Sequence, residues 1–105
     1  MKVLDIKIEN SEILPISDIS GLIKSDTSYV AFSVNIVDKE WQYCDRVALL
    51  FEVDKKQYMV PITDKTTELP SDVSKERYYT IRAIGLSGTT KLATKNKLLI
   101  EQEEI

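Results

Sequence analysis

Histidine is absent from this 105-residue chain. Its absence removes the commonest general base and the commonest zinc ligand, so Ser-His-Asp and Cys-His catalysis are excluded in their usual forms. The single cysteine, Cys44, leaves no partner for an internal disulfide. The chain has only three glycines, which are too scattered to form a phosphate-binding loop. We therefore expect no enzyme activity and no cofactor.

The chain also lacks a basic excess and long apolar runs. Fourteen basic residues stand against seventeen acidic ones, which gives a formal charge of -3. Nucleic-acid binding needs a basic face, so no nucleic-acid partner is predicted. No window approaches twenty consecutive apolar residues, so no membrane insertion is predicted either.

Carboxylates are the remaining acid–base groups. Asp38 with Glu40, and Asp45 with Asp64, are candidates for acid–base chemistry or calcium binding. Their spacing resembles no calcium loop, so we interpret them as solvated turn residues and expect no metal site. Cys44 lies between an aromatic segment and a strand, with an acid and an arginine next in the chain. We favour a structural, semi-buried thiol over a nucleophile.

Alternation of apolar and polar residues recurs along most of the chain. It is clearest in residues 28–37, where Val30, Phe32, Val34 and Ile36 share one face. The predicted strands cover residues 4–9, 12–16, 28–37, 46–53, 57–62, 77–84 and 97–101. About seven short strands at near-regular spacing predict a single all-β domain over residues 1–105, either a sandwich or a barrel. Consecutive strands joined by short loops are expected to be mostly antiparallel.

The connections carry finer predictions. Residues 54–56 lack the glycine of a tight hairpin turn, which favours a loop of three or four residues over one of two. Residues 71–74 favour one helical turn, and residues 17–28 favour a loop that holds either a helical turn or a brief strand. Pro61 cannot donate to a β-ladder, so it is expected near a sheet edge or at the end of its strand.

Aromatic side chains are the best candidates for binding. Trp41 beside Tyr43 would suit a platform that stacks a sugar, although core packing is the favoured interpretation of the single tryptophan. Tyrosines are common both at interfaces and on half-buried strands. The candidate interface residues are Trp41, Tyr43, Tyr58 and Tyr78.

An ordered series of motifs carries a family resemblance. The motifs are Asp38-Lys39-Glu40-Trp41, Ala48-Leu49-Leu50-Phe51, Tyr58, Leu69 to Val73, Ile84-Gly85 and Lys91 to Asn96. Over residues 28–101 this order resembles a small immunoglobulin-like module of bacteriophage structural proteins of Gram-positive hosts. That module occurs in tail, baseplate and head-fibre proteins. The resemblance implies a single antiparallel immunoglobulin-like β-sandwich of about seven strands, with the tryptophan and the phenylalanine in the core.

The same resemblance implies assembly rather than catalysis. The expected partners are other virion structural proteins, with a homo-oligomer as a further possibility, and the expected location is the virion. Docking is expected at strand edges or loops, or the module serves as a base for fibres, and the candidate edges are the amino-terminal strand and the strand of Pro61. Two alternatives stay open: a module that binds a small ligand or carbohydrate through Trp41 and Tyr43, and a small regulatory or inhibitor protein that binds a host protein.

Overall fold

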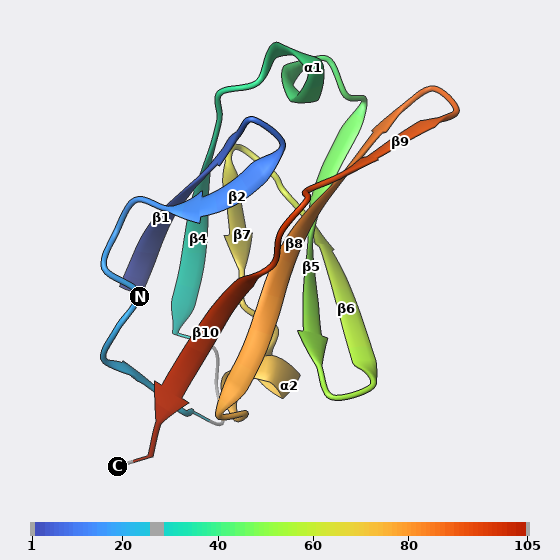
Figure 1. Cartoon of the computed structure of the whole chain (residues 1–105). Helices are drawn as coiled ribbons and strands as arrows, with labels where there is room; N and C mark the ends of the chain where they lie inside the picture. The colour runs from blue at the N-terminus through green and yellow to red at the C-terminus, as the bar shows by residue number, and fades with distance from the viewer. Residues whose placement is uncertain (1, 26–28, 105) are drawn as a thin grey trace.

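The computed structural model describes residues 2–25 and 29–104, which form ten strands and two four-residue helices (Figure 1). In chain order these elements are β1 (Lys2–Glu9), β2 (Glu12–Pro15), β3 (Leu22–Ile23), β4 (Val30–Ile36), α1 (Lys39–Gln42), β5 (Arg46–Val53), β6 (Lys56–Pro61), β7 (Thr66–Glu68), α2 (Ser71–Ser74), β8 (Tyr78–Ser87), β9 (Thr90–Ala93) and β10 (Leu98–Glu103). Predictions that concern Ser28 and Ile105 lie outside the described residues. The all-β prediction is confirmed.

The strands form two sheets that face each other (Figure 1). One sheet has the order β2-β1-β4-β7, and the other has the order β3-β10-β8-β5-β6, with β9 paired to β8. Figure 1 shows α1 at one end of the two layers and α2 near the other end. We call the end of the sandwich that carries α1 the α1 end.

Most pairings are antiparallel, but two are parallel, so the sheets are mixed and differ from those of the predicted antiparallel sandwich. β1 runs parallel to β4, from Lys2 opposite Val30 to Ile8 opposite Ile36. β10 also runs parallel to β3. The chain between β1 and β4 passes through β2 in the same sheet and β3 in the other sheet, so it returns beside β1 in the original direction. Parallel neighbours need such a long crossover, and pattern matching between consecutive strands does not detect it.

The core lies between the sheets, where the predicted strand faces meet. Phe32 of β4 and Phe51 of β5 are both fully buried, with ring centroids 5.8 Å apart. Tyr79 of β8 extends this aromatic cluster, 6.2 Å from the Phe51 ring. The predicted inward faces are therefore confirmed for β4 and β5. Burial of Leu4, Ile6 and Ile8 confirms the inward face of the first strand as well.

Several turns are tighter than predicted. Val53 pairs directly with Lys56, so the β5–β6 loop has two residues, and Asp54 supplies the positive φ of 51° that glycine usually provides. The strand predicted over residues 77–84 is too short, because β8 continues to Ser87 and then turns through Gly88, at φ 61°, into the unpredicted strand β9. The helical turn over 71–74 is confirmed as α2, and the segment before β4 holds a brief strand, β3.

One of the two predicted sheet edges is correct. β1 lies between β2 and β4, so the amino-terminal strand is not an edge. β6 is an edge strand that ends at Pro61, as predicted. The hydroxyl of Thr67 in β7 donates to the Pro61 carbonyl at 2.7 Å, which ties the two sheets together at this side.

The opposite side of the sandwich is joined by Asn96, just before β10. Its Oδ1 accepts the Ile13 N–H at 2.8 Å, and its Nδ2 donates to the Ile13 carbonyl at 2.9 Å. The Lys95 N–H adds a bond to the Ser11 carbonyl at 2.8 Å. One side chain thus imitates a strand neighbour for β2, and we call this contact the closed seam.

Candidate functional site

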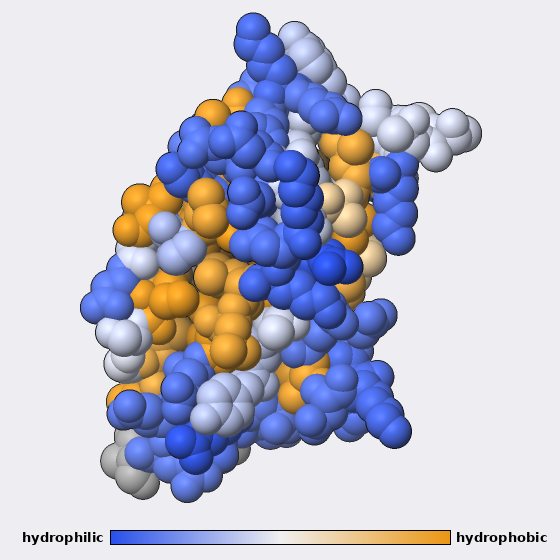
Figure 2. Space-filling model, viewed as in Figure 1, coloured by the Kyte–Doolittle hydropathy of each residue, from blue (hydrophilic) through white to orange (hydrophobic). Residues whose placement is uncertain are grey.

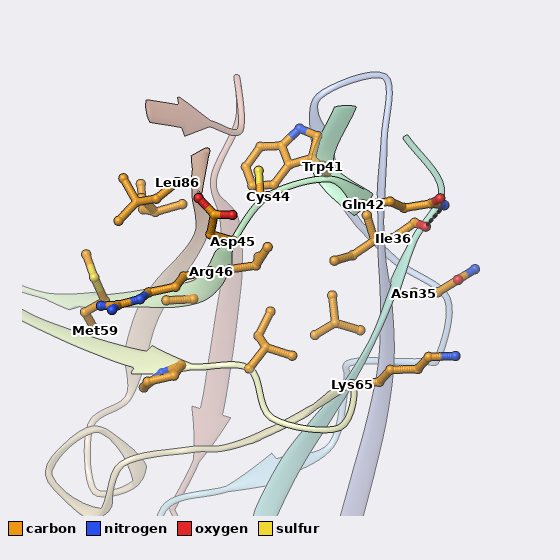
Figure 3. Close-up of a pocket in the computed structure, with 16 residues that line it drawn as sticks. Asn35, Ile36, Trp41, Gln42, Cys44, Asp45, Arg46, Met59, Lys65 and Leu86 are labelled. Carbon is orange, nitrogen blue, oxygen red and sulfur yellow. Dashed lines mark hydrogen bonds between the residues drawn. The ribbon is translucent and has the colours of Figure 1, made fainter. Parts of the chain in front are cut away.

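A cleft of about 850 Å³ opens between the two sheets at the α1 end. Its walls come from the end of β4, from α1, from the start of β5, from the end of β6 and from β8. In Figure 3, Arg46 and Met59 lie on one side of the cleft and Asn35 and Lys65 on the other, with Trp41 above them. This opening is called the cleft below.

The cleft exists because two strands extend further than their neighbours. β7 pairs with β4 only from Ala31 to Ser33, whereas β4 continues to Ile36. β6 pairs with β5 only as far as Ala48, whereas β5 begins at Arg46. The segment between β6 and β7 contributes two further bonds, from Ile62 N to the Val47 carbonyl at 2.9 Å and from Val34 N to the Lys65 carbonyl at 2.8 Å. On their cleft side, no strand of the described residues pairs with these two ends beyond these bonds, whereas on the other side β4 pairs with β1 and β5 pairs with β8.

The top of the cleft is formed by α1 packed on β8. Trp41 is only 1% exposed and lies against Gly85. A Cβ at residue 85 would lie 3.1 Å from two Trp41 ring atoms and 2.8 Å from the Cys44 Sγ. Glycine at this position therefore lets the indole and the thiol pack directly on the strand backbone.

Gln42 lies at the free end of β4. Its Nε2 donates to the Ile36 carbonyl at 2.8 Å, the bond drawn in Figure 3, and more weakly to the Val37 carbonyl at 3.4 Å. A side-chain amide thus satisfies a strand carbonyl that β7 does not reach. The sequence alone gave no signal for this role.

The charged groups of the cleft are unevenly engaged. Asp45 Oδ2 accepts the Gly88 N–H at 2.9 Å, which holds the β8–β9 turn. Arg46 and Lys65 are the two cations among the lining side chains. Both are exposed, so their charges face solvent at the mouth of the cleft.

The thiol of Cys44 is not activated. Partial burial raises the pKa of Cys44 above its usual 9.0, and the nearby charges of Asp45 and Glu40 raise this pKa further. The thiol therefore stays protonated near neutral pH, which argues against a nucleophilic role. This result agrees with the interpretation of Cys44 as a structural residue.

The four predicted interface residues do not form one site. Trp41 is buried, whereas Tyr43 beside it is 77% exposed, so the two rings do not offer a shared stacking surface. Tyr58 is half-buried on β6, and Tyr78 is exposed on β8, with β5 between these strands. Arg77 lies over the Tyr78 ring, 5.3 Å from its centroid.

Two of the four candidate carboxylates, Asp38 and Asp45, accept hydrogen bonds from backbone N–H groups. Asp38 accepts the N–H groups of Asn10 and Ser11 at 2.8 and 2.7 Å, and both of those residues have positive φ. Among residues 2–25 and 29–104, no group of three or more Cys, Asp and Glu side chains is placed to hold a metal ion. In the same residues, no helix is both long and apolar enough to cross a membrane.

Comparisons with protein-family models, with curated protein sequences and with solved structures give no match for this chain. Its functional interpretation therefore depends on the geometry of the described residues and on the motif resemblance. The cleft is the feature of that geometry best suited to binding, because it combines apolar walls with a few polar groups.

Proposed function

We propose that this chain is a non-enzymatic bacteriophage structural protein that acts through protein–protein assembly contacts in the virion. The single observation that supports this most is the cleft, an apolar opening between two strand ends of the β-sandwich. Exposed strand ends and apolar clefts are typical places where one protein adds to another. The tail, the baseplate and a head fibre or decoration are the locations that the motif resemblance implies.

Exposed apolar side chains support the proposal. Met59 and Leu86 line the cleft and are 58% and 41% exposed. Away from the cleft, Val3, Ile16 and Leu99 are each more than half exposed. Figure 2 shows apolar surface in the middle of the face that carries β1 and β10, bordered by polar residues.

The finer fold assignment belongs to this proposal. Two facing sheets with Phe32 and Phe51 packed between them agree with an immunoglobulin-like module. Trp41 is also buried, which agrees with the core position that the resemblance implies. The parallel β1–β4 pairing is a departure that an immunoglobulin-like assignment has to accommodate.

Immunogold electron microscopy tests the virion location. Phage particles from the source strain are labelled with antibody against this protein, and antibody preabsorbed with the purified protein is the control. Gold at a fixed place on the particle is the expected result, and it names the location as head, neck, tail or baseplate. Unlabelled particles, with the protein free in the lysate, would contradict the proposal and favour a regulatory protein that binds a host protein.

A second function is favoured by the size of the cleft. A volume of about 850 Å³ falls within the range of small-molecule sites, and the walls are largely apolar. This alternative differs from the predicted sugar platform, because the Trp41 face is buried. It predicts that an apolar ligand raises the melting temperature of the purified protein, whereas the assembly function needs no such ligand.

A further inference from the structure

We propose that the cleft binds an extended, acidic segment of a partner protein, which pairs with the end of β4 beyond β7. This inference rests on the proposed assembly function and names the kind of partner contact that the cleft makes. The strand end, the wall side chains and the charges of the cleft all favour this one occupant.

The backbone at the end of β4 favours an extended occupant. In a strand the N–H and C=O of alternate residues point to the same side, so the backbone of Ile36 points to the same side as that of Val34. Val34 N donates to Lys65 O on the β7 side, which places the Ile36 backbone toward the cleft. A segment that continues the line of β7 would therefore meet the Ile36 backbone. This is strand addition at a sheet edge.

Gln42 holds the place that such a segment would take. Its side-chain amide donates to the Ile36 carbonyl at 2.8 Å, as a neighbouring strand would through its backbone. Gln42 is exposed and lies on a four-residue helix, so its amide can move to solvent when a backbone N–H replaces it. The exchange conserves one hydrogen bond and adds the backbone bonds of the incoming segment.

The walls favour alternate apolar side chains on that segment. Val47 and Ile62 line the inner part of the cleft between the sheets, whereas Asn35 is exposed on its rim. Side chains of an added strand point alternately inward and outward. Every second residue would therefore be buried against the inner wall, and the residues between would remain in solvent.

The charges favour an acidic segment. Arg46 and Lys65 line opposite sides of the cleft (Figure 3), and the carboxylate of Asp45, which accepts the Gly88 N–H, is the one anion among the lining side chains, so the two cations exceed it by one charge. The chain as a whole carries a formal charge of -3, so the cleft differs in sign from the molecule around it. Complementary charge steers a partner and sets its register more than it sets its affinity.

Amide hydrogen exchange followed by NMR tests this inference on the full chain. The probe is a capped seven-residue peptide with valine at alternate positions, threonine between them and glutamate at both ends. At millimolar peptide, the exchange rate of the Ile36 amide is expected to fall to roughly one tenth of its value in the free protein, or lower, because this amide becomes hydrogen bonded in the complex. A peptide with proline at its centre, which cannot maintain the strand pairing, is the control.

Charge reversal at the cleft provides the matched variants. Arg46→Glu with Lys65→Glu is expected to weaken binding of the peptide by roughly fivefold or more. Lys55→Glu with Lys56→Glu makes the same charge change at the β5–β6 hairpin, which lies at the opposite end of β5. This second double variant is expected to bind as the wild type does. Melting curves of both variants confirm that they fold.

Three outcomes would overturn the inference. They are no protection of the Ile36 amide at millimolar peptide, equal protection by the proline peptide, and chemical-shift changes in the cleft without protection of Ile36. The third outcome would assign the cleft to apolar ligands. Gold labelling of particles is independent of these results, so the virion proposal can stand while this inference fails, and the reverse also holds.

Discussion

The two sides of this sandwich differ in how the sheets meet. At the closed seam, Asn96 bonds both backbone groups of Ile13, and Lys95 adds a third bond. At the cleft, β4 and β5 both extend past their neighbours, and the Gln42 amide caps the Ile36 carbonyl and, more weakly, the Val37 carbonyl. One side is therefore completed by the protein's own side chains, whereas the other leaves strand ends and apolar walls accessible.

The difference between the two sides separates residues that stabilise the fold from residues that are available for binding. A buried backbone group without a partner is destabilising, so the fold completes the seam beside the fully buried Ile13. At the cleft the strand ends remain near solvent, so the backbone does not require a protein partner there. Mutations on the closed seam should therefore affect folding, and mutations at the cleft should affect binding.

The largest effect is expected in the core that both sides share. Phe51→Ala should lower the free energy of unfolding by about 3–5 kcal/mol, because Phe51 is fully buried between Phe32 and Tyr79. Urea unfolding followed by circular dichroism measures the change. Phe32→Ala should give a loss of the same size. Native-like melting of either variant would show that the face assignment is wrong.

The closed seam should give the next largest effect. Asn96→Ala removes both bonds to Ile13 and leaves a buried N–H without its acceptor, which should cost about 1–3 kcal/mol. The matched control is Asn35→Ala, which makes the same chemical change at the rim of the cleft. Asn35 is exposed, so its replacement should change stability by less than about 0.5 kcal/mol. Equal losses for the two variants would contradict the distinction between the sides.

The top of the cleft gives a prediction about packing. Gly85→Ala places a methyl group 2.8 Å from the Cys44 Sγ and 3.1 Å from Trp41 ring atoms, which should destabilise the fold by about 1–3 kcal/mol. Cys44→Ala removes the closest of these contacts. The double variant should therefore lose less stability than the sum of the two single losses. Strict additivity, measured by thermal or urea unfolding, would show that the thiol does not oppose the methyl group.

The sequence predicted those features of the fold that depend on neighbouring residues. Alternation is local, and it correctly assigned the inward faces of β1, β4 and β5. It also identified the edge position of Pro61, because proline lacks an N–H in any context. The parallel β1–β4 pairing was not predictable in this way, since it depends on where an intervening segment crosses to the other sheet.

The residues that shape the closed seam and the top of the cleft were missed for a similar reason. Asn96 and Ile13 are 83 positions apart, and no local pattern connects them. The packing role of Gly85 was not predicted, because its close approach to Trp41 appears only when α1 packs on β8. Strand β9 was missed because a two-residue turn at Gly88 resembles a longer loop when no tight-turn pair such as Asn-Gly is present.

An ion pair on the outer face of the larger sheet should give the smallest effect, and it belongs to neither side. Lys97 Nζ lies 3.1 Å from Glu52 Oε1, and this hydrogen bond, assisted by one from Gln57, lowers the pKa of Glu52 below its usual 4.5. A carboxyl group whose folded pKa is lowered stabilises the fold above its unfolded pKa, and that contribution disappears as pH falls through the folded value.

Lys97→Gln should therefore reduce stability by about 0.2–1 kcal/mol at pH 7, with the difference from wild type shrinking toward about pH 3. Lys91→Gln on β9 is the matched control, and urea unfolding at both pH values makes the measurement. A loss that persists undiminished at low pH would mean that Lys97 acts through packing of its aliphatic chain and not through the charge of Glu52.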